Sequence, residues 1–340
     1  MNLFLKRVTA LFLGSILTMV FAEFALSRSS LVDSPPGQYR RSETRAFEHT
    51  PGFRGRDKVG NPIVINSQGL REEDYPLEKP EGVYRILVLG DSVTFGENVA
   101  AEESFPEQIQ LLLNEARSGP RVEVLNAGVR GYNTYQELLM LEEVGLSYDP
   151  DLVIVCYVVN DADPFSNQAG LINPKYKRLI ALKEFVKGHS YLYAFLKRLF
   201  VLAKALTKPG SVEDTTLGHF SEGDPGWLAS YDSLEKIKRV TGARGVRFMM
   251  TVMPQIKGLA PGDAYPERNQ RIHDRILEAG RALGIDTVDL LPVLRGYDPE
   301  ALKIFSNDTL HPSPLGHRLM AEKLAAHIRA EFLKAGAGQG

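Results

Sequence analysis

From residue 83 onward, short apolar runs alternate with longer segments in which apolar residues recur at helical spacing. The run Ile86–Leu89 is typical of a strand that is covered on both faces of a parallel sheet. Other runs have the same character: Val122–Asn126, Asp151–Val159, Val246–Val252 and Ile285–Asp289. Helices are predicted between and after them, over residues 104–116, 134–145, 227–241, 266–283 and 314–333. The alternation predicts an α/β protein whose five parallel strands carry helices on both faces.

The first residues depart from this pattern. Lys6 and Arg7 precede the apolar run Val8–Ala22, which resumes after Glu23. A run of this length can cross a bilayer, which requires about 20 apolar residues. We therefore predict a transmembrane signal anchor within residues 1–28. A cleaved signal peptide is the alternative, but no convincing small-x-small cleavage site follows the run.

The charges around this run bear on its orientation. Lys6 and Arg7 favour a cytoplasmic amino terminus, with the remaining chain exported to the periplasm or the cell surface. Arginines on the far side of the run argue in the opposite direction: Arg28, Arg40, Arg41 and Arg45.

Residues 29–82 are rich in proline, glycine and charge, and the one strand-like run there is Asn61–Asn66. This composition is typical of a stalk or a wrapping arm rather than of an independent core. We expect an extracytoplasmic linker or arm that holds the following domain away from the bilayer.

A long connection, residues 165–225, separates the third and fourth predicted strands. Lys175–Ile180 and Tyr191–Lys204 have helical patterns with an apolar stripe and a basic rim. Such a helix can form a lid or lie on anionic lipid headgroups. It can also simply pack on the domain with its lysines in water, which is the favoured interpretation because surface helices are normally amphipathic.

Composition adds limits rather than a function. The 340 residues are 44% hydrophobic and 24% charged, as in ordinary folded proteins. The last residues, 335–340, are expected to form a flexible tail. The net charge of -2, without a dominant basic stripe, argues against nucleic acid as a partner. Cys156 is the only cysteine, so it excludes an internal disulfide and any metal site built on cysteine spacing.

Polar residues follow the predicted strands at the points where the strands end. Ser92 follows the first strand, Gly131 the second and Asn160 the third, while Asp308 and His311 lie beyond the fifth. The carboxyl ends of parallel strands meet at one edge of a sheet, so we expect these residues to converge on one crevice. A serine hydroxyl needs a base to become a nucleophile, and His311 is the candidate base. Asp308 could accept the other imidazole N–H and hold the ring in place.

The same edge could stabilise a developing oxyanion. The backbone N–H groups of Ser92 and Gly131 and the side-chain amide of Asn160 provide donors, each worth about 3 kcal/mol in such sites. Each of these residues could instead serve only a turn or a helix start. His317 is a rival base, although it falls inside the last predicted helix. Asp161 and Asp163 could suggest a cation site, but further ligands in register are lacking.

At this point the sequence resembles a known family. Gly90-Asp91-Ser92, Gly131, Asn160-Asp161 and Asp308 to His311 match, in order and context, the four blocks of the SGNH hydrolases, also called the GDSL esterase/lipase family. The similarity covers about residues 83–334, which we take as the hydrolase domain. It departs from the usual Gly-x-Asn-Asp pattern because Val158 replaces the glycine.

The resemblance implies a flavodoxin-like three-layer α/β/α fold and metal-free, cofactor-free hydrolysis of acyl esters. It implies that Ser92 is the nucleophile, His311 the base and Asp308 the residue that orients it, with Ser92, Gly131 and Asn160 forming the oxyanion hole. The expected activity is hydrolysis of acyl esters, acetyl esters among them, of a lipid or a cell-surface carbohydrate. An O-acyltransferase acting on an exported polysaccharide is an alternative, as is a non-catalytic glycan-binding protein. The intact set of Ser92, Asp308 and His311 argues against the last.

Overall fold

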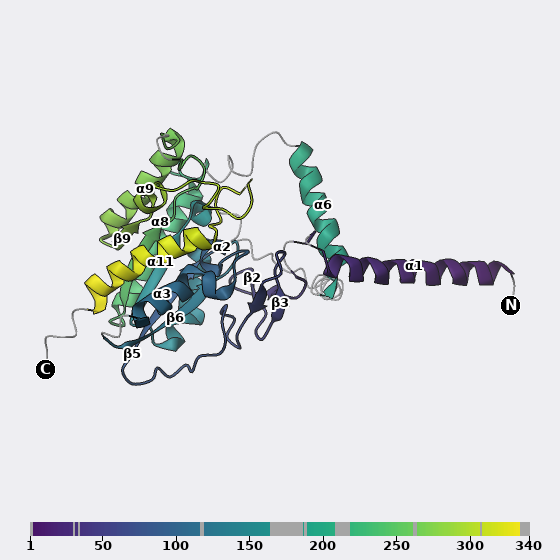
Figure 1. Ribbon diagram of the computed structural model, residues 1–340, viewed down its shortest axis with the longest axis horizontal. Helices are drawn as coiled ribbons and strands as arrows, with labels where there is room; N and C mark the ends of the chain where they lie inside the picture. Colours follow the sequence, from purple (N-terminus) through teal and green to yellow (C-terminus); the bar gives the residue numbers. More distant parts are fainter. Residues whose placement is uncertain are drawn as a thin grey trace.

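The structure is a computed structural model that describes residues 3–29, 31–32, 35–115, 119–163, 186, 189–207, 218–260, 264–306 and 308–333. It begins with one long helix, α1 (Leu3–Ser27), which projects from the rest of the molecule (Figure 1). Its segment Lys6–Ser27 is long and apolar enough to cross a membrane. This is the helix that the sequence predicted at the amino terminus.

The centre of the molecule is a parallel sheet. It contains β5 (Val83–Gly90), β6 (Arg121–Gly128), β7 (Leu152–Tyr157), β8 (Arg247–Val252) and β9 (Asp286–Asp289), in the spatial order β6-β5-β7-β8-β9. Every residue of β7 is buried, as expected for a central strand that helices cover on both faces. The predicted five-stranded parallel sheet is therefore confirmed.

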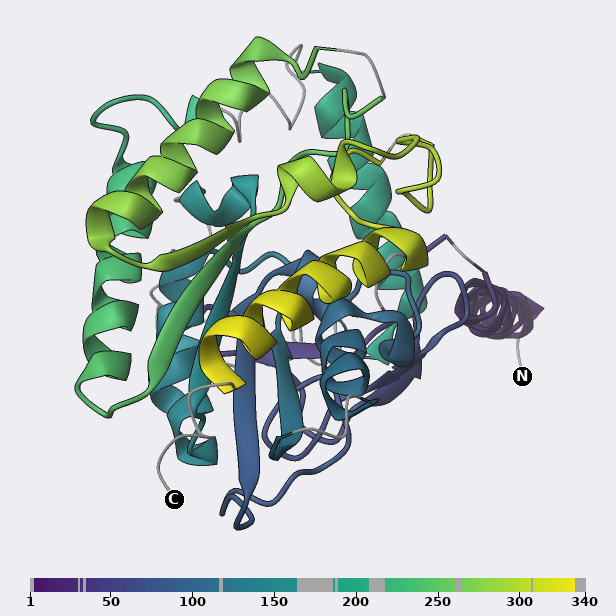
Figure 2. The same ribbon diagram turned by 60° about the vertical axis from the view of Figure 1, so that its left-hand side comes forward.

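Helices cover both faces of this sheet (Figure 2). The chain moves from β5 to β6 in one direction and then crosses back to β7, β8 and β9. Because such crossovers are right-handed, this reversal puts the intervening helices on opposite faces. One face carries α3 (Phe105–Glu115) and α11 (Pro314–Ile328), which pack together, and the other carries α4 (Thr134–Glu143), α8 (Pro225–Gly242) and α9 (Glu267–Leu283).

The reversal also creates a crevice. The chain leaves β5 and β7, which are neighbours, toward opposite faces, and ligands bind at such switch points in open α/β sheets. Ser92 is separated from β5 by Asp91 alone, and Asn160 follows β7 in the short 3-10 turn η3 (Val159–Ala162). The topology therefore places the predicted site residues at the expected crevice.

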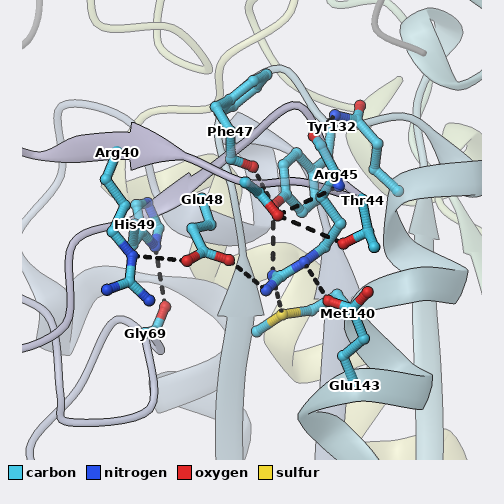
Figure 3. Close-up of polar contacts among 12 residues, drawn as sticks. Arg40, Thr44, Arg45, Phe47, Glu48, His49, Gly69, Tyr132, Met140 and Glu143 are labelled. Atoms are coloured by element: carbon cyan, nitrogen blue, oxygen red, sulfur yellow. Dashed lines mark hydrogen bonds and ion pairs between the residues drawn. The ribbon is translucent and has the colours of Figure 1, made fainter. Parts of the chain in front are cut away.

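The segment before the sheet contacts the domain closely. It forms the hairpins β1 (Tyr39–Arg41) with β2 (Phe47–His49), and β3 (Arg54–Arg56) with β4 (Pro62–Val64). Arg45, in the first hairpin, donates from Nε to Glu143 Oε2 of α4 at 2.9 Å and from Nη2 to Glu48 Oε2 at 2.6 Å (Figure 3). The Tyr132 hydroxyl donates to the Phe47 carbonyl at 2.7 Å. Through these contacts the hairpin of β1 and β2 packs against the domain that contains the sheet.

The amino-terminal end of the sheet holds a buried ion pair. Arg85 on β5 lies opposite Glu123 on β6, and its Nη2 lies 2.7 Å from Glu123 Oε2. Arg85 Nη1 also donates to the carbonyls of Tyr148 and Leu77 at 2.7 and 3.1 Å. The side chains of Arg85 and Glu123 are only 0% and 4% exposed.

The remaining elements adjust the predicted boundaries. A one-turn helix, α2 (Ser92–Phe95), and a 3-10 turn, η1 (Ala101–Glu103), precede α3, where the sequence analysis predicted no helix. The 3-10 turn η2 (Gly145–Tyr148) follows α4, and another short helix, α10 (Leu291–Leu294), follows β9. The last predicted helix ends in the π-helical turn η6 (Arg329–Leu333). In the long connection, α6 (Tyr191–Thr207) matches the second predicted helix, whereas Lys175–Ile180 and the tail 335–340 lie outside the described residues.

Candidate active site

The candidate nucleophile lies on a tight turn between β5 and α2. Asp91 is the N-cap of α2, and its Oδ1 accepts the N–H of Val93 at 2.8 Å. The end of β6 approaches this turn so closely that a Cβ on Gly128 would lie 2.3 Å from the backbone nitrogen of Phe95. Only glycine fits there. Ser92 is therefore fixed at the start of a buried helical turn and is 6% exposed.

The loop before α11 brings a histidine to this serine. His311 Nε2 lies 2.8 Å from Ser92 Oγ, and His311 Nδ1 lies 2.9 Å from Asp308 Oδ2. Asp308 Oδ1 also accepts the N–H groups of Leu310 and His311, both at 3.0 Å, which closes the loop around the carboxylate. Ser313 then caps α11 and Pro314 opens it. The structure thus brings Ser92, His311 and Asp308 into one hydrogen-bonded chain.

The pKa values of His311 and Asp308 are those expected of a histidine base that is hydrogen-bonded to a carboxylate. Burial opposes ionisation of Asp308, but the hydrogen bond and charge of His311, together with the backbone N–H groups, lower the pKa of Asp308 to about 2. Burial disfavours the imidazolium, but the hydrogen bond and charge of Asp308, with smaller contributions from Asp91 and Glu97, raise the pKa of His311 above its ordinary value. A histidine of raised basicity is well suited to accept the serine proton.

Asn160 contacts Asp91, the residue before the serine. Burial raises the pKa of Asp91, and the nearby charge of His311 and hydrogen bonds from Val93, Asn160 and Ser92 partly offset that rise. The Asn160 amide thus lies beside the serine turn, and its Nδ2 also reaches the Tyr132 carbonyl at 3.5 Å.

Gly131, the residue before Tyr132, has φ of +79°, a left-handed conformation that glycine adopts without strain. The three predicted oxyanion-hole residues therefore come from the turns that follow β5, β6 and β7.

The Val158 departure from the family pattern is accommodated. Val158 has an extended backbone with φ of -124°, which any residue can adopt, and its side chain is buried. Its N–H donates to Asp161 Oδ2 at 2.6 Å, and Asp161 Oδ1 accepts the Thr134 hydroxyl at 3.0 Å. Asp161 therefore braces the turn that carries Asn160, which is a structural use of the carboxylate that had suggested a cation site.

His317, the rival base, lies in the core. It is fully buried, its Nδ1 accepts the N–H of Phe105 at 3.2 Å, and its ring stacks on that of Phe105 at 6.1 Å. Burial, together with the charges of Arg71 and His311, lowers the pKa of His317 to about 3. The neutral ring fixes the start of α3.

Sequence reasoning missed Arg71, which the arm contributes to the site. Its guanidinium donates to the carbonyls of Phe95, Gly96 at 2.7 Å and Val99 at 2.9 Å, and it lies 4.3 Å from the centre of the Phe95 ring. The Phe95 and Gly96 carbonyls end the one-turn helix that begins at Ser92, so the positive charge lies at the carboxyl end of that turn, where cations are favoured. No local motif marks this role, because it depends on how the arm folds back.

Comparisons with known proteins agree with this geometry. A sequence model described as the GDSL-like Lipase/Acylhydrolase family matches residues 88–319. The chain is 35% identical over 101 residues to a probable alginate O-acetylase, AlgJ, from Pseudomonas aeruginosa, a match that covers 28% of this chain and 26% of that protein. It is 25% identical over 182 residues to an arylesterase from Vibrio mimicus, covering 46% of this chain and 90% of the arylesterase.

Two solved structures illustrate the similarity at low sequence identity. A lipase/acylhydrolase from Enterococcus faecalis is 18% identical with a TM-score of 0.45, covering 73% of this chain and 96% of that one. The acetyl xylan esterase AlAXEase is 16% identical with a TM-score of 0.44, covering 72% and 99%.

Proposed function

Because this chain belongs to the GDSL-like lipase/acylhydrolase family and is an ester-hydrolysing enzyme, we propose that it works through a covalent acyl-enzyme on Ser92. The observation that carries the proposal is the hydrogen-bonded chain from Ser92 Oγ through His311 to Asp308, with distances of 2.8 and 2.9 Å. These distances suit direct proton transfer from the hydroxyl to the imidazole.

The reaction follows from this geometry. His311 Nε2 takes the proton as Ser92 Oγ attacks the ester carbonyl, and the charge that develops on the carbonyl oxygen is met by the N–H groups of Ser92 and Gly131 and the amide of Asn160. His311 then gives its proton to the leaving alcohol. Water, with His311 again as base, releases the acid, while Asp308 holds the ring and stabilises the imidazolium throughout.

The proposed substrate is an acyl ester, and an acetylated carbohydrate is the class that we favour. The support is the 35% identity to a protein named for alginate O-acetylation. That match spans about a quarter of the relative, so it supports the chemistry of the group transferred rather than a particular polymer.

We further propose that α1 anchors the enzyme in a membrane with its catalytic domain on the extracytoplasmic side. The support is the apolar segment Lys6–Ser27, together with Lys6 and Arg7 before the apolar run.

Trapping the nucleophile tests the acyl-enzyme. The full-length protein in detergent is incubated with p-nitrophenyl esters of increasing chain length and, separately, with a fluorophosphonate, followed by mass spectrometry of the labelled peptide. We expect hydrolysis, a single adduct on Ser92 and loss of both in Ser92→Ala. An adduct elsewhere, or Ser92→Ala that hydrolyses as fast as the parent, would remove Ser92 from the mechanism.

A second candidate is transfer of the acyl group to a sugar hydroxyl in place of water, and the alginate O-acetylase match is what favours it. Adding an oligosaccharide acceptor to the p-nitrophenyl acetate assay separates the two. A hydrolase releases acetate at an unchanged rate, whereas a transferase releases p-nitrophenol faster and yields acetylated oligosaccharide.

A further inference from the structure

Helix α6 exposes a large apolar stripe. Leu196, Leu199 and Phe200 are 55%, 44% and 70% exposed. Their spacing puts them on one face of the helix. Lys197 and Arg198 lie between them in sequence and therefore point to other sides. The helix thus shows an apolar face and a basic flank to its surroundings.

The start of α6 is attached to the end of α1. The Glu23 carboxylate of α1 accepts the Ser190 hydroxyl and the N–H groups of Tyr191 and Leu192, the latter two at 2.7 and 3.3 Å. A carboxylate at a helix amino terminus meets free N–H donors and the positive end of the helix dipole. This contact also accounts for the single acid near the end of the apolar run of α1.

A second contact fixes the same corner. Arg198, two turns along α6, donates from Nη1 to the carbonyl of Leu31, just beyond α1, at 2.7 Å. Because α6 is held at both Glu23 and Leu31, it starts at the level where the apolar segment Lys6–Ser27 ends.

The two helices run across one another. Figure 1 shows α1 lengthwise and α6 crossing its direction at the inner end of α1, and in Figure 2 α1 is seen nearly end-on while α6 stands upright. A helix that crosses the axis of a membrane-spanning helix at its end runs along the bilayer surface. The 17 residues of α6 would extend about 25 Å along that surface.

We propose that α6 lies in the headgroup region of the bilayer that α1 crosses, with Leu196, Leu199 and Phe200 among the acyl chains and Lys197 among anionic headgroups. Such placement is the usual use of an amphipathic helix with a basic flank. The inference rests on the membrane anchor proposed for α1 and is independent of the esterase chemistry. Besides lipid, a second copy of the chain or the enzyme's own crevice could cover the stripe.

Spin labels on single cysteines measure the depth of α6. Cys156 is fully buried, so introduced cysteines can be labelled selectively. The full-length chain is reconstituted in vesicles of phosphatidylethanolamine and phosphatidylglycerol as Leu196→Cys, Leu199→Cys or Phe200→Cys. Lys197→Cys is the matched control on the same helix, Leu13→Cys reports on α1, and Leu228→Cys, which replaces a 55% exposed side chain of α8, reports on water.

We expect oxygen to relax the labels at 196, 199 and 200 several-fold more efficiently than a water-soluble nickel complex does, with the opposite preference at 197 and 228. Labels on the stripe that prefer nickel while Leu13→Cys prefers oxygen would overturn the proposal with the anchor intact. If Leu13→Cys also prefers nickel, the anchor and the proposal both fail. Spin–spin broadening between copies would assign the stripe to a second copy, and labels protected from both oxygen and nickel would assign it to the enzyme's own crevice. Either result would overturn the proposal too.

Discussion

The two ends of the central sheet each hold a carboxylate paired with a basic side chain, and they use the pair differently. At the amino-terminal end, Arg85 and Glu123 lie 2.7 Å apart with exposures of 0% and 4%. At the carboxyl-terminal end, His311 and Asp308 lie 2.9 Å apart with exposures of 23% and 16%. The distances are nearly equal, so the difference lies in what else each partner contacts.

The guanidinium group of Arg85 makes all of its contacts within the fold. It donates to Glu123 and to the carbonyls of Tyr148 and Leu77, so its guanidinium is engaged by the fold itself. His311 instead uses its second ring nitrogen, Nε2, to contact the Ser92 hydroxyl, a group that can react. A buried pair with complete partners holds strands together, whereas a pair that ends on a hydroxyl at a crevice can do chemistry.

The largest expected effect comes from making the carboxyl-end pair neutral. Asp308→Asn keeps the shape of the side chain but lets it donate to His311 in the wrong tautomer. We expect kcat to fall by about 10⁴, as in other serine triads, which is far more than the accompanying loss of stability would cause. Steady-state kinetics and thermal unfolding measured on one preparation check both parts. A fall in kcat that merely tracks a fall in folded fraction would contradict the assignment.

The next effect tests the amino-end pair. Glu123→Ala leaves Arg85 buried without its counter-ion, and removing one partner of such a pair destabilises by about 3–5 kcal/mol. Denaturant unfolding measures the change, and activity per folded molecule should stay near that of the parent.

The matched control is Glu73→Ala, which breaks an ion pair with Arg54 in which both side chains are more than half exposed. It should leave the unfolding midpoint nearly unchanged. Equal unfolding midpoints for the two variants would show that burial does not distinguish the pairs.

An effect of similar size in free energy, but on the reaction rate rather than on stability, is expected at Asn160. Asn160→Ala removes one donor from the proposed oxyanion hole, and loss of such a donor costs roughly 10² to 10³ in kcat, or about 3–4 kcal/mol. KM for p-nitrophenyl acetate should change little, because the donor acts mainly in the transition state. An unchanged kcat would mean that Asn160 serves only to brace Asp91.

The smallest effect is a shift in pH dependence. Because the folded protein raises the pKa of His311, the rising limb of kcat/KM should have its midpoint above the ordinary histidine value of 6.5. Asp308→Asn should move the residual limb downward, since the charge that favours the imidazolium is gone.

The contributions of His311 and Asp308 to the stability of the fold depend on pH in opposite directions. The raised pKa of His311 contributes stability below its unfolded pKa, and this is lost as pH rises through the folded value. Asp308, with a pKa of about 2, contributes stability above its unfolded pKa that is lost as pH falls through the folded value. If the rising limb of kcat/KM had its midpoint at or below pH 6.5, that would contradict the coupling of His311 to Asp308.

The sheet and the residues at its carboxyl edge could be predicted because their signals are local. Ile86–Leu89 and Leu152–Tyr157 are continuous apolar runs, and Ser92 and Asn160 follow them directly. Residues that end parallel strands must share an edge, so convergence of Ser92, Gly131, Asn160 and the Asp308–His311 loop followed from fold class.

The contribution of the arm could not be predicted, because its signals are not local. Arg71 and Arg45 lie in a segment rich in proline, glycine and charge, and their partners are Phe95 and Glu143, 24 and 98 residues later. Neither periodicity nor a motif links such positions. The one-turn helix α2 was missed for a related reason, since four residues are too few to show a period.

The separation of Ser92 from His311, 219 residues along the chain, has a consequence for biosynthesis. A ribosome that adds about 5–20 residues per second exposes the serine roughly 10 to 45 s before the histidine. During that interval the nascent polypeptide holds an ordinary alcohol with no base beside it. The proposed ester cleavage thus depends on synthesis of the last part of the chain, and a protein truncated anywhere before His311 would be synthesised without its base.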